Sequence, residues 1–158
     1  MIMTKMAWGL ATFCAAVGVS GQALAADTSY LGGWKVIRAV IAPWADAAHP
    51  LDRAEAARLV GKSIVVGPHA ITGPQALRCD GAHYHLSDAT PDMLFQGAFG
   101  EMQSKNKSVE PNRIAASLGF VGTRIRTLET GCELDFHFVD KTTAEIGLND
   151  YVYTLKKQ

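Results

Sequence analysis

The sequence has little net charge, few cysteines and no long apolar run beyond its first residues. Its 15 Lys and Arg side chains balance 15 Asp and Glu side chains, so the formal net charge at pH 7 is zero. Without a basic patch or tail, the chain lacks the electrostatic signature of a nucleic-acid-binding protein. We find no internal repeat and no low-complexity tract, which favours an ordinary globular domain.

Motifs of catalysis are also missing. No serine lies in a Gly-x-Ser-x-Gly elbow, and no Gly-rich loop precedes a helix in the manner of a phosphate-binding loop. The acidic residues are scattered over turns and polar strand faces rather than paired on an apolar background, where a catalytic pKa would be shifted. We therefore expect a protein that is not an enzyme and that uses no cofactor.

The first 25 residues have the pattern of a secretory signal peptide. Lys5 supplies the positive charge, residues 6–19 form an apolar segment, and Ala23-Leu24-Ala25 matches the small-residue cleavage site. The apolar segment is shorter than the roughly 20 residues that a membrane-spanning helix needs. We predict cleavage after Ala25, which leaves one β-rich domain over residues 26–158. This domain would have no membrane span and would be periplasmic or secreted.

Cysteine usage points to a single disulfide. Cys14 lies in the predicted signal peptide, which leaves Cys79 and Cys132. An even number of cysteines in an exported chain favours a bridge, so we predict that these two are joined. Closing a loop of this length stabilises a fold by about 4 kcal/mol in the chain-entropy account. The alternative of two buried free thiols stays open.

The rest of the chain is divided into short β-branched runs by Gly, Pro and Asp turns. One short helix is predicted over residues 52–60, where Asp52 and Glu55 form an N-terminal capping pattern. Residues 93–99 are apolar and are either a strand or a docked loop, whereas residues 101–112 are polar and are either a mobile loop or a short helix. Strands are predicted at 34–41, 63–66, 70–72, 77–86 (a hairpin about Asp80-Gly81), 120–130, 133–140 and 144–155. This spacing favours a small antiparallel β-barrel or β-sandwich with one or two short helices.

Gly32-Gly33-Trp34 opens the first predicted strand. A Gly-x-Trp at this place resembles the lipocalin signature, and the length suits a calycin-like barrel. The resemblance implies an interior cavity for a small apolar or amphipathic ligand, with Trp34 plugging one end. Lipocalins often carry an arginine over that tryptophan, which implies such a role for Arg124 or Arg126. The chain departs from the family because its clearest helix follows the first strand, and the simpler alternative is a core tryptophan beside a glycine turn.

The last predicted strand carries an aromatic face. Tyr151, Tyr153 and Leu155 alternate along it and therefore point to one side. Faces of this kind usually belong to the core. The alternative is that the two tyrosines face a ligand or a partner.

Three histidines are candidates for a metal site. His83 and His85 are two residues apart, so on a strand both imidazoles point to the same face. His137 or Asp135 on a neighbouring strand could complete a zinc or copper site. The alternation within residues 134–138 places both of these side chains on the polar face. The alternative is two solvated histidines without a metal.

Three functions are compatible with these features. We favour an exported, monomeric binding protein for a small apolar or amphipathic ligand. The others are a protein-interaction module, such as an inhibitor of an envelope or host hydrolase, and a His-based metal-binding protein. An interior cavity would indicate the first function, and a protruding loop at residues 101–112 over a solid core would indicate the second. His137 close to both His83 and His85 would indicate the third.

Overall fold

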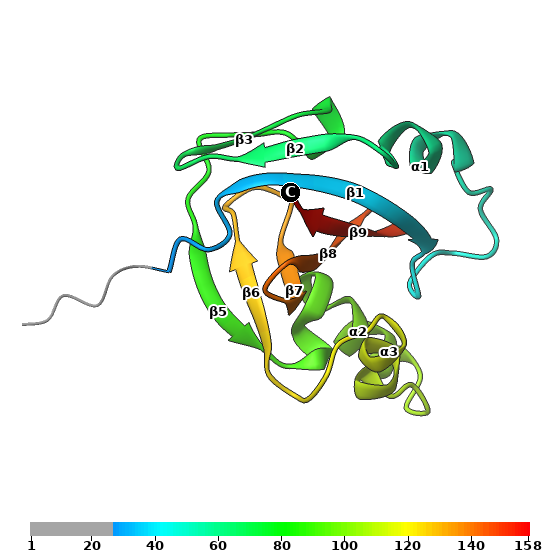
Figure 1. Ribbon diagram of the computed structural model, residues 1–158. Coiled ribbons are helices and arrows are strands. Elements are labelled where there is room, and N and C mark those ends of the chain that lie inside the picture. The colour runs from blue at the N-terminus through cyan, green and yellow to red at the C-terminus, as the bar shows by residue number, and fades with distance from the viewer. Residues whose placement is uncertain (1–26) are drawn as a thin grey trace, which may run out of the picture.

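The computed structural model describes residues 27–158, so the predicted signal peptide lies outside the described residues. These residues form one antiparallel nine-stranded sheet that curls into a half-barrel (Figure 1). The prediction of a small, mainly β, antiparallel domain of the barrel or sandwich type is confirmed, and the sheet has the form of a curled half-barrel. In sheet order the strands are β4 (Cys79–Asp80), β3 (Ala70–Thr72), β2 (Ser63–Val66), β1 (Gly32–Ile41), β9 (Tyr151–Lys157), β8 (Thr143–Leu148), β7 (Phe136–Asp140), β6 (Ile125–Glu129) and β5 (His85–Ala89).

Short helices complete the fold. Within residues 27–158, no helix has the length and apolar character needed to cross a bilayer. The helices are α1 (Arg53–Leu59), α2 (Leu94–Lys105) and α3 (Pro111–Ser117), with 3-10 turns η1 (Gln75–Leu77) and η2 (Pro91–Met93).

Strand β1 is the longest strand and pairs on both sides. Its first residues pair with β2, and most of its length pairs with β9. The register with β9 shifts between Val36 and Arg38, which marks a β-bulge. Because bulges increase the local twist and bend a strand, this shift helps β1 to carry the curl of the sheet.

The two edge strands, β4 and β5, are consecutive in the chain although they lie at opposite ends of the sheet. The predicted hairpin about Asp80-Gly81 is therefore wrong. The connecting residues instead bridge the two edges, because the Ala82 N–H donates to the His69 carbonyl and the His83 N–H donates to the Thr130 carbonyl, both at 2.8 Å.

The predicted disulfide is present and reinforces this closure. Cys79 on β4 is bonded to Cys132 in the β6–β7 loop, with 6.1 Å between their Cα atoms. The bridge thus joins the two sides of the half-barrel near the start of β5.

The sheet is buried on both faces. The main core fills the concave face and combines side chains from both sides of the curl, including Trp34, Ile64, Ile71, Phe136 and Tyr153. A second core forms where α2 and α3 cover part of the opposite face; in Figure 1 these helices lie at the end of the sheet far from β2 and β3. Its members are Ala42, Leu94, Phe95, Phe99, Ala115, Leu118, Phe120, Ile125 and Val152.

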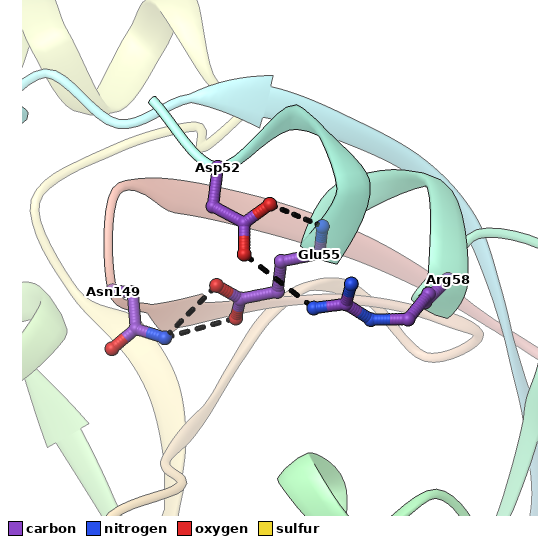
Figure 2. A network of polar contacts seen from close by, with 4 residues as sticks. All are labelled: Asp52, Glu55, Arg58 and Asn149. Carbon is purple, nitrogen blue, oxygen red and sulfur yellow. Dashed lines mark hydrogen bonds and ion pairs between the residues drawn. The ribbon is translucent and has the colours of Figure 1, made fainter. Parts of the chain in front are cut away.

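Helix α1 has the predicted start. The Asp52 carboxylate accepts the Glu55 N–H at 3.0 Å, as a capping side chain does. Figure 2 shows that the Glu55 carboxylate in turn accepts from the Asn149 side-chain amide, at 2.9 and 3.1 Å. Arg58 pairs with Asp52 at 3.5 Å within the capped helix, and the Glu55–Asn149 hydrogen bonds fasten α1 to the turn between β8 and β9.

Residues 93–99 contain neither a strand nor a loop but the start of α2. Phe95, Gln96 and Gly97 have positive φ angles of 51°, 59° and 83°, so a left-handed turn precedes the right-handed helix. Left-handed backbone is disfavoured for side chains with a Cβ, and it must be held by its surroundings. Much of residues 101–112 is helical as well, at the end of α2 and the start of α3.

The C-terminal strands lie where they are predicted, but one predicted strand is in fact two. The run predicted over 144–155 is a hairpin of β8 and β9, with Leu148 paired to Tyr151. Asn149 in its turn has a φ of 50°, a left-handed conformation that asparagine tolerates better than most residues. The adjacent β7–β8 hairpin is equally tight, because Asp140 accepts from the Thr142 N–H and from the hydroxyls of Thr142 and Thr143.

Candidate functional site

A groove of about 540 Å³ opens beside β5, β6 and β7. We call it the β5–β7 groove. Most of its lining residues lie at the end of these strands that is remote from the disulfide, at the start of β6 and the end of β7, whereas Leu86 lies near the start of β5. Its lining residues are Asp27, Ser29, Tyr30, Leu86, Phe120, Val121, Arg124, Ile125, Arg126, Phe138, Val139, Asp140 and Lys141.

The floor and one lip of the groove are apolar. Leu86 and Phe138 are half-buried and pack against the main core, and Phe120 is buried in the second core. Val121 projects from the lip with 87% of its surface exposed. An exposed valine beside a concave aromatic floor is the kind of surface that an apolar ligand covers.

The rim of the groove is charged, and it includes both arginines singled out from the sequence. The Arg124 guanidinium donates to Asp88 and the Arg126 guanidinium donates to Asp27, each at 3.0 Å. Asp88 pairs with Arg126 across β5 and β6, so the charged side chains gather at one place on the sheet. Lys141 adds a further cation to the lining.

The three aromatic residues predicted to face a ligand lie elsewhere. Tyr151 and Tyr153 are 5% and 0% exposed, so the expectation that this face belongs to the core is confirmed. Trp34 is 1% exposed and donates its indole N–H to the Tyr30 carbonyl at 2.9 Å. None of the three lines the β5–β7 groove.

The cation above Trp34 is neither of the predicted arginines. It is Lys157, whose ammonium nitrogen lies 5.5 Å from the centre of the indole ring. Lys157 also donates to the Ser29 carbonyl, so it holds the residues that precede β1 close to the tryptophan. Sequence reasoning missed this residue because Lys157 stands next to Trp34 only through the β1–β9 pairing.

The three histidines do not gather around one point. His83 and His85 are exposed, whereas His137 is 2% exposed. His85 pairs with Glu129 and His137 pairs with Thr127, so the two histidines stand two strand spacings apart across the sheet, roughly 10 Å, and two residues apart along it. In the part of the chain that the structure describes, no three His, Cys, Asp or Glu residues form a group suited to a metal ion.

His137 was expected on the polar face, and this expectation is wrong. Its Nε2 accepts the Phe95 N–H at 2.9 Å, and its Nδ1 lies 3.0 Å from the Thr127 hydroxyl. Because a main-chain N–H can only donate, Nε2 carries no proton, and Nδ1 donates to Thr127, which donates onward to the Ile125 carbonyl. Burial lowers the pKa of His137 to about 4, so the ring is neutral and holds the left-handed turn before α2.

His137 belongs to a polar row that crosses the sheet beneath the helices. Successive strand pairings align Arg38, Thr154, Glu145, His137, Thr127 and Ser87. Glu145 is 1% exposed and accepts from the Thr154 hydroxyl with both carboxylate oxygens, at 2.9 and 3.1 Å. Burial raises the pKa of Glu145 to about 7, against the opposing effects of Thr154 and Arg38. The sequence gives no sign of this row, because nothing in it reveals the lateral register.

A second concavity, of about 280 Å³, lies beside the left-handed turn. The rings of Trp44 and Phe95 form one wall with 5.1 Å between their centres, and His137 and Asp135 line another. Burial, reinforced by the nearby Glu129 charge, raises the pKa of Asp135 above its usual value. This hollow is about half as large as the β5–β7 groove and is suited to a smaller molecule.

Comparison with protein-family models, with curated proteins and with solved structures found no match for this chain.

Proposed function

We propose that the protein is an exported binding protein that holds a small amphipathic molecule in the β5–β7 groove. The observation that carries the proposal is the coincidence of an apolar floor and an arginine-bearing rim in one concavity of about 540 Å³. Volumes of 300–1,000 Å³ are typical of small-molecule sites, which combine an apolar lining with a few polar groups.

The ligand would lie at the mouth of the half-barrel rather than in its interior. Large side chains such as Trp34, Phe136 and Tyr153 fill the concave face. The interior cavity that the lipocalin resemblance implied is thus replaced in the proposal by an open groove at the end of the sheet. The predicted signal peptide and the disulfide between Cys79 and Cys132 support a periplasmic or secreted location.

A neutral amphiphile tests the proposal. In a two-dimensional amide NMR titration with octan-1-ol, we expect the largest shifts at Leu86, Val121 and Phe138. Val121→Asp should weaken octan-1-ol binding at least fivefold, because a carboxylate at the lip must lose water when the chain binds. Val60→Asp, an equally polar change at a remote and 40% exposed position, should leave the affinity unchanged.

The same titration can overturn the proposal. Saturable shifts that cluster around Trp44 and Asp135 would move the site to the smaller hollow, and an absence of saturable shifts would remove the binding function altogether. Equal loss of affinity in Val121→Asp and Val60→Asp would show that binding does not depend on the groove.

A further inference from the structure

We infer that the ligand of the β5–β7 groove is a single-chain amphiphile with an anionic head group, and that Arg124 and Arg126 hold this head group. The inference rests on the proposed function and adds the charge and orientation of the ligand. It follows from how the charged residues around the groove are already engaged.

The acidic residues of the lining are occupied. Asp140 accepts three hydrogen bonds inside the β7–β8 turn, and these bonds hold its pKa below its usual range. Asp27 accepts from the Ser29 N–H as well as from Arg126. Against these two carboxylates, the lining presents the cations of Arg124, Arg126 and Lys141. The lining residues alone thus hold one more cation than carboxylates, and Asp88, which lies outside the lining, supplies the third carboxylate by pairing with Arg124.

The arginines, in contrast, have donors to spare. A guanidinium has five N–H donors, and in the described residues each of these two makes one side-chain hydrogen bond. Both partners of each pair are open to solvent, since the exposed fractions are 78% and 36% for Arg124 with Asp88, and 48% and 45% for Arg126 with Asp27. Such surface pairs are weak and exchange readily.

A carboxylate or phosphate head matches these donors. The planar guanidinium presents parallel N–H groups that fit two oxygens of one anion, which makes arginine the usual residue for this task. The head group would then displace the Asp88 carboxylate from the Arg124 guanidinium. The same cations would repel an ammonium head, and the three carboxylates near them already accept hydrogen bonds, so an anionic head is the better match.

The apolar chain of such a ligand would run along the floor. Leu86 and Phe138 form that floor, and the Phe138 ring is backed by Trp34 with 6.0 Å between ring centres. Val121 would cover the chain from the lip, where it is otherwise exposed to water. The volume of about 540 Å³ suits one chain, so we commit to a free amphiphile rather than to a membrane surface.

Three ligands with the same chain length and different head groups separate the contribution of the head-group charge from that of the apolar chain. They are octanoate, octan-1-ol and octylammonium. By calorimetry or NMR titration we expect octanoate to bind at least tenfold more tightly than octan-1-ol, and octylammonium to bind most weakly. Raising the salt concentration should reduce this preference, because the contacts to the head are exposed. Equal affinities for octanoate and octan-1-ol would overturn the inference while leaving the proposed function standing. Failure of both to bind would overturn both.

Two sets of variants locate the charge. Arg124→Gln/Arg126→Gln should reduce the octanoate affinity to that of octan-1-ol without changing octan-1-ol binding. The charge-matched control Arg53→Gln/Arg113→Gln changes two exposed arginines on other elements and should leave both affinities unchanged. If the control lowers octanoate binding as much as the groove variant, the head is held by net charge and not by these arginines.

Removal of the charge of Asp88, the partner of Arg124, should have the opposite effect on octanoate affinity. Asp88→Asn should raise the octanoate affinity severalfold, because Arg124 no longer has to leave a carboxylate. An unchanged or reduced affinity would contradict the exchange at Arg124.

Sedimentation of the protein with phosphatidylglycerol vesicles, together with no binding of octanoate, would replace the free amphiphile by a membrane and overturn the inference.

Discussion

The pairing of His137 with Glu145 predicts two opposing dependences of stability on pH. His137 is neutral in the folded protein until the pH falls to about 4, whereas an unfolded histidine binds its proton near pH 6.5. Between these values the unfolded chain holds more protons, so the His137 contribution to the free energy of unfolding rises with pH. A pKa difference of about 2.5 corresponds to about 3 kcal/mol across the window from pH 4 to 6.5.

Glu145 acts in the other direction. Its pKa is raised from 4.5 to about 7, so between these values the folded protein holds a proton that the unfolded chain has lost. The Glu145 contribution is complete below pH 4.5 and is lost as the pH rises to 7, again by about 3 kcal/mol. The two contributions overlap between pH 4.5 and 6.5 and nearly cancel in the natural protein.

Single variants should uncover each slope. We expect the stability of His137→Gln, relative to the natural protein, to fall by about 2–3 kcal/mol between pH 4.5 and 6.5, because the rising contribution is gone. Glu145→Gln should rise by a similar amount relative to the natural protein over the same range. Denaturant unfolding at pH 4.5, 5.5 and 6.5 measures both, and the difference from the natural protein at each pH removes the contribution of the surface carboxylates.

The outcome that would refute this reasoning is a constant difference between variant and natural protein across the range. A constant difference for His137→Gln would mean that the pKa of His137 is the same in the folded and the unfolded protein. Nitrogen-15 NMR of the ring provides an independent check, since the hydrogen bonds require a proton on Nδ1 and none on Nε2 at neutral pH.

Three further predictions concern stability. Replacing both bridged cysteines by serine should lower the free energy of unfolding by about 4 kcal/mol for a loop of 53 residues, and equal melting with and without reductant would contradict it. Tyr153→Phe should stabilise the protein by about 1 kcal/mol in denaturant unfolding, because its hydroxyl is buried without a hydrogen-bond partner among residues 27–158; a clear loss of stability would reveal a bound water. Gly147→Ala should destabilise by about 1–3 kcal/mol, because the new Cβ would lie 2.9 Å from the Phe95 ring, whereas Gly33→Ala meets only the end of Gln158 and should change the melting temperature much less.

Local signals were sufficient for much of the fold. The first strand, the strands at 63–66 and 70–72 and the capped helix at 52–60 follow from β-branched runs, turn residues and the Asp52 cap. These features depend on neighbours within a few residues, which a sequence displays directly. The pairing of Cys79 with Cys132 also followed from counting, since only two cysteines remain after the predicted signal peptide.

Features that depend on the sheet register could not be predicted in this way. Alternation in residues 134–138 assumes that one face of the strand meets water, but β7 is buried on both faces, so Phe136 and His137 are both less than 3% exposed. The left-handed turn at Phe95 has no local signature either, because the residue that holds it lies 42 positions away. Its existence depends on a contact between distant segments of the chain.

The candidate site followed the same division. The lipocalin resemblance implies a contact of Arg124 or Arg126 with Trp34. In the structure both arginines instead lie at the groove rim, because they stand at the start of β6. The contact with Trp34 is made by Lys157 from β9. Sequence alone thus found residues of interest without their partners, because the partners are set by strand pairing.

The position of the groove follows from how the half-barrel is closed. The sheet leaves two free edges, and the cross-edge hydrogen bonds at Ala82 and His83 together with the disulfide join them at the end where β5 begins. The groove lies beside the main core between Leu86, near the start of β5, and Lys141, which follows β7, and the half-buried Leu86 and Phe138 form its floor. An open groove of this kind leaves apolar surface exposed unless something covers it, and in the proposed function the charged rim selects the molecule that does so. The disulfide and the arginines therefore have separable roles. In the proposed function, the disulfide maintains the curl that shapes the groove, and the arginines would determine the charge of the ligand.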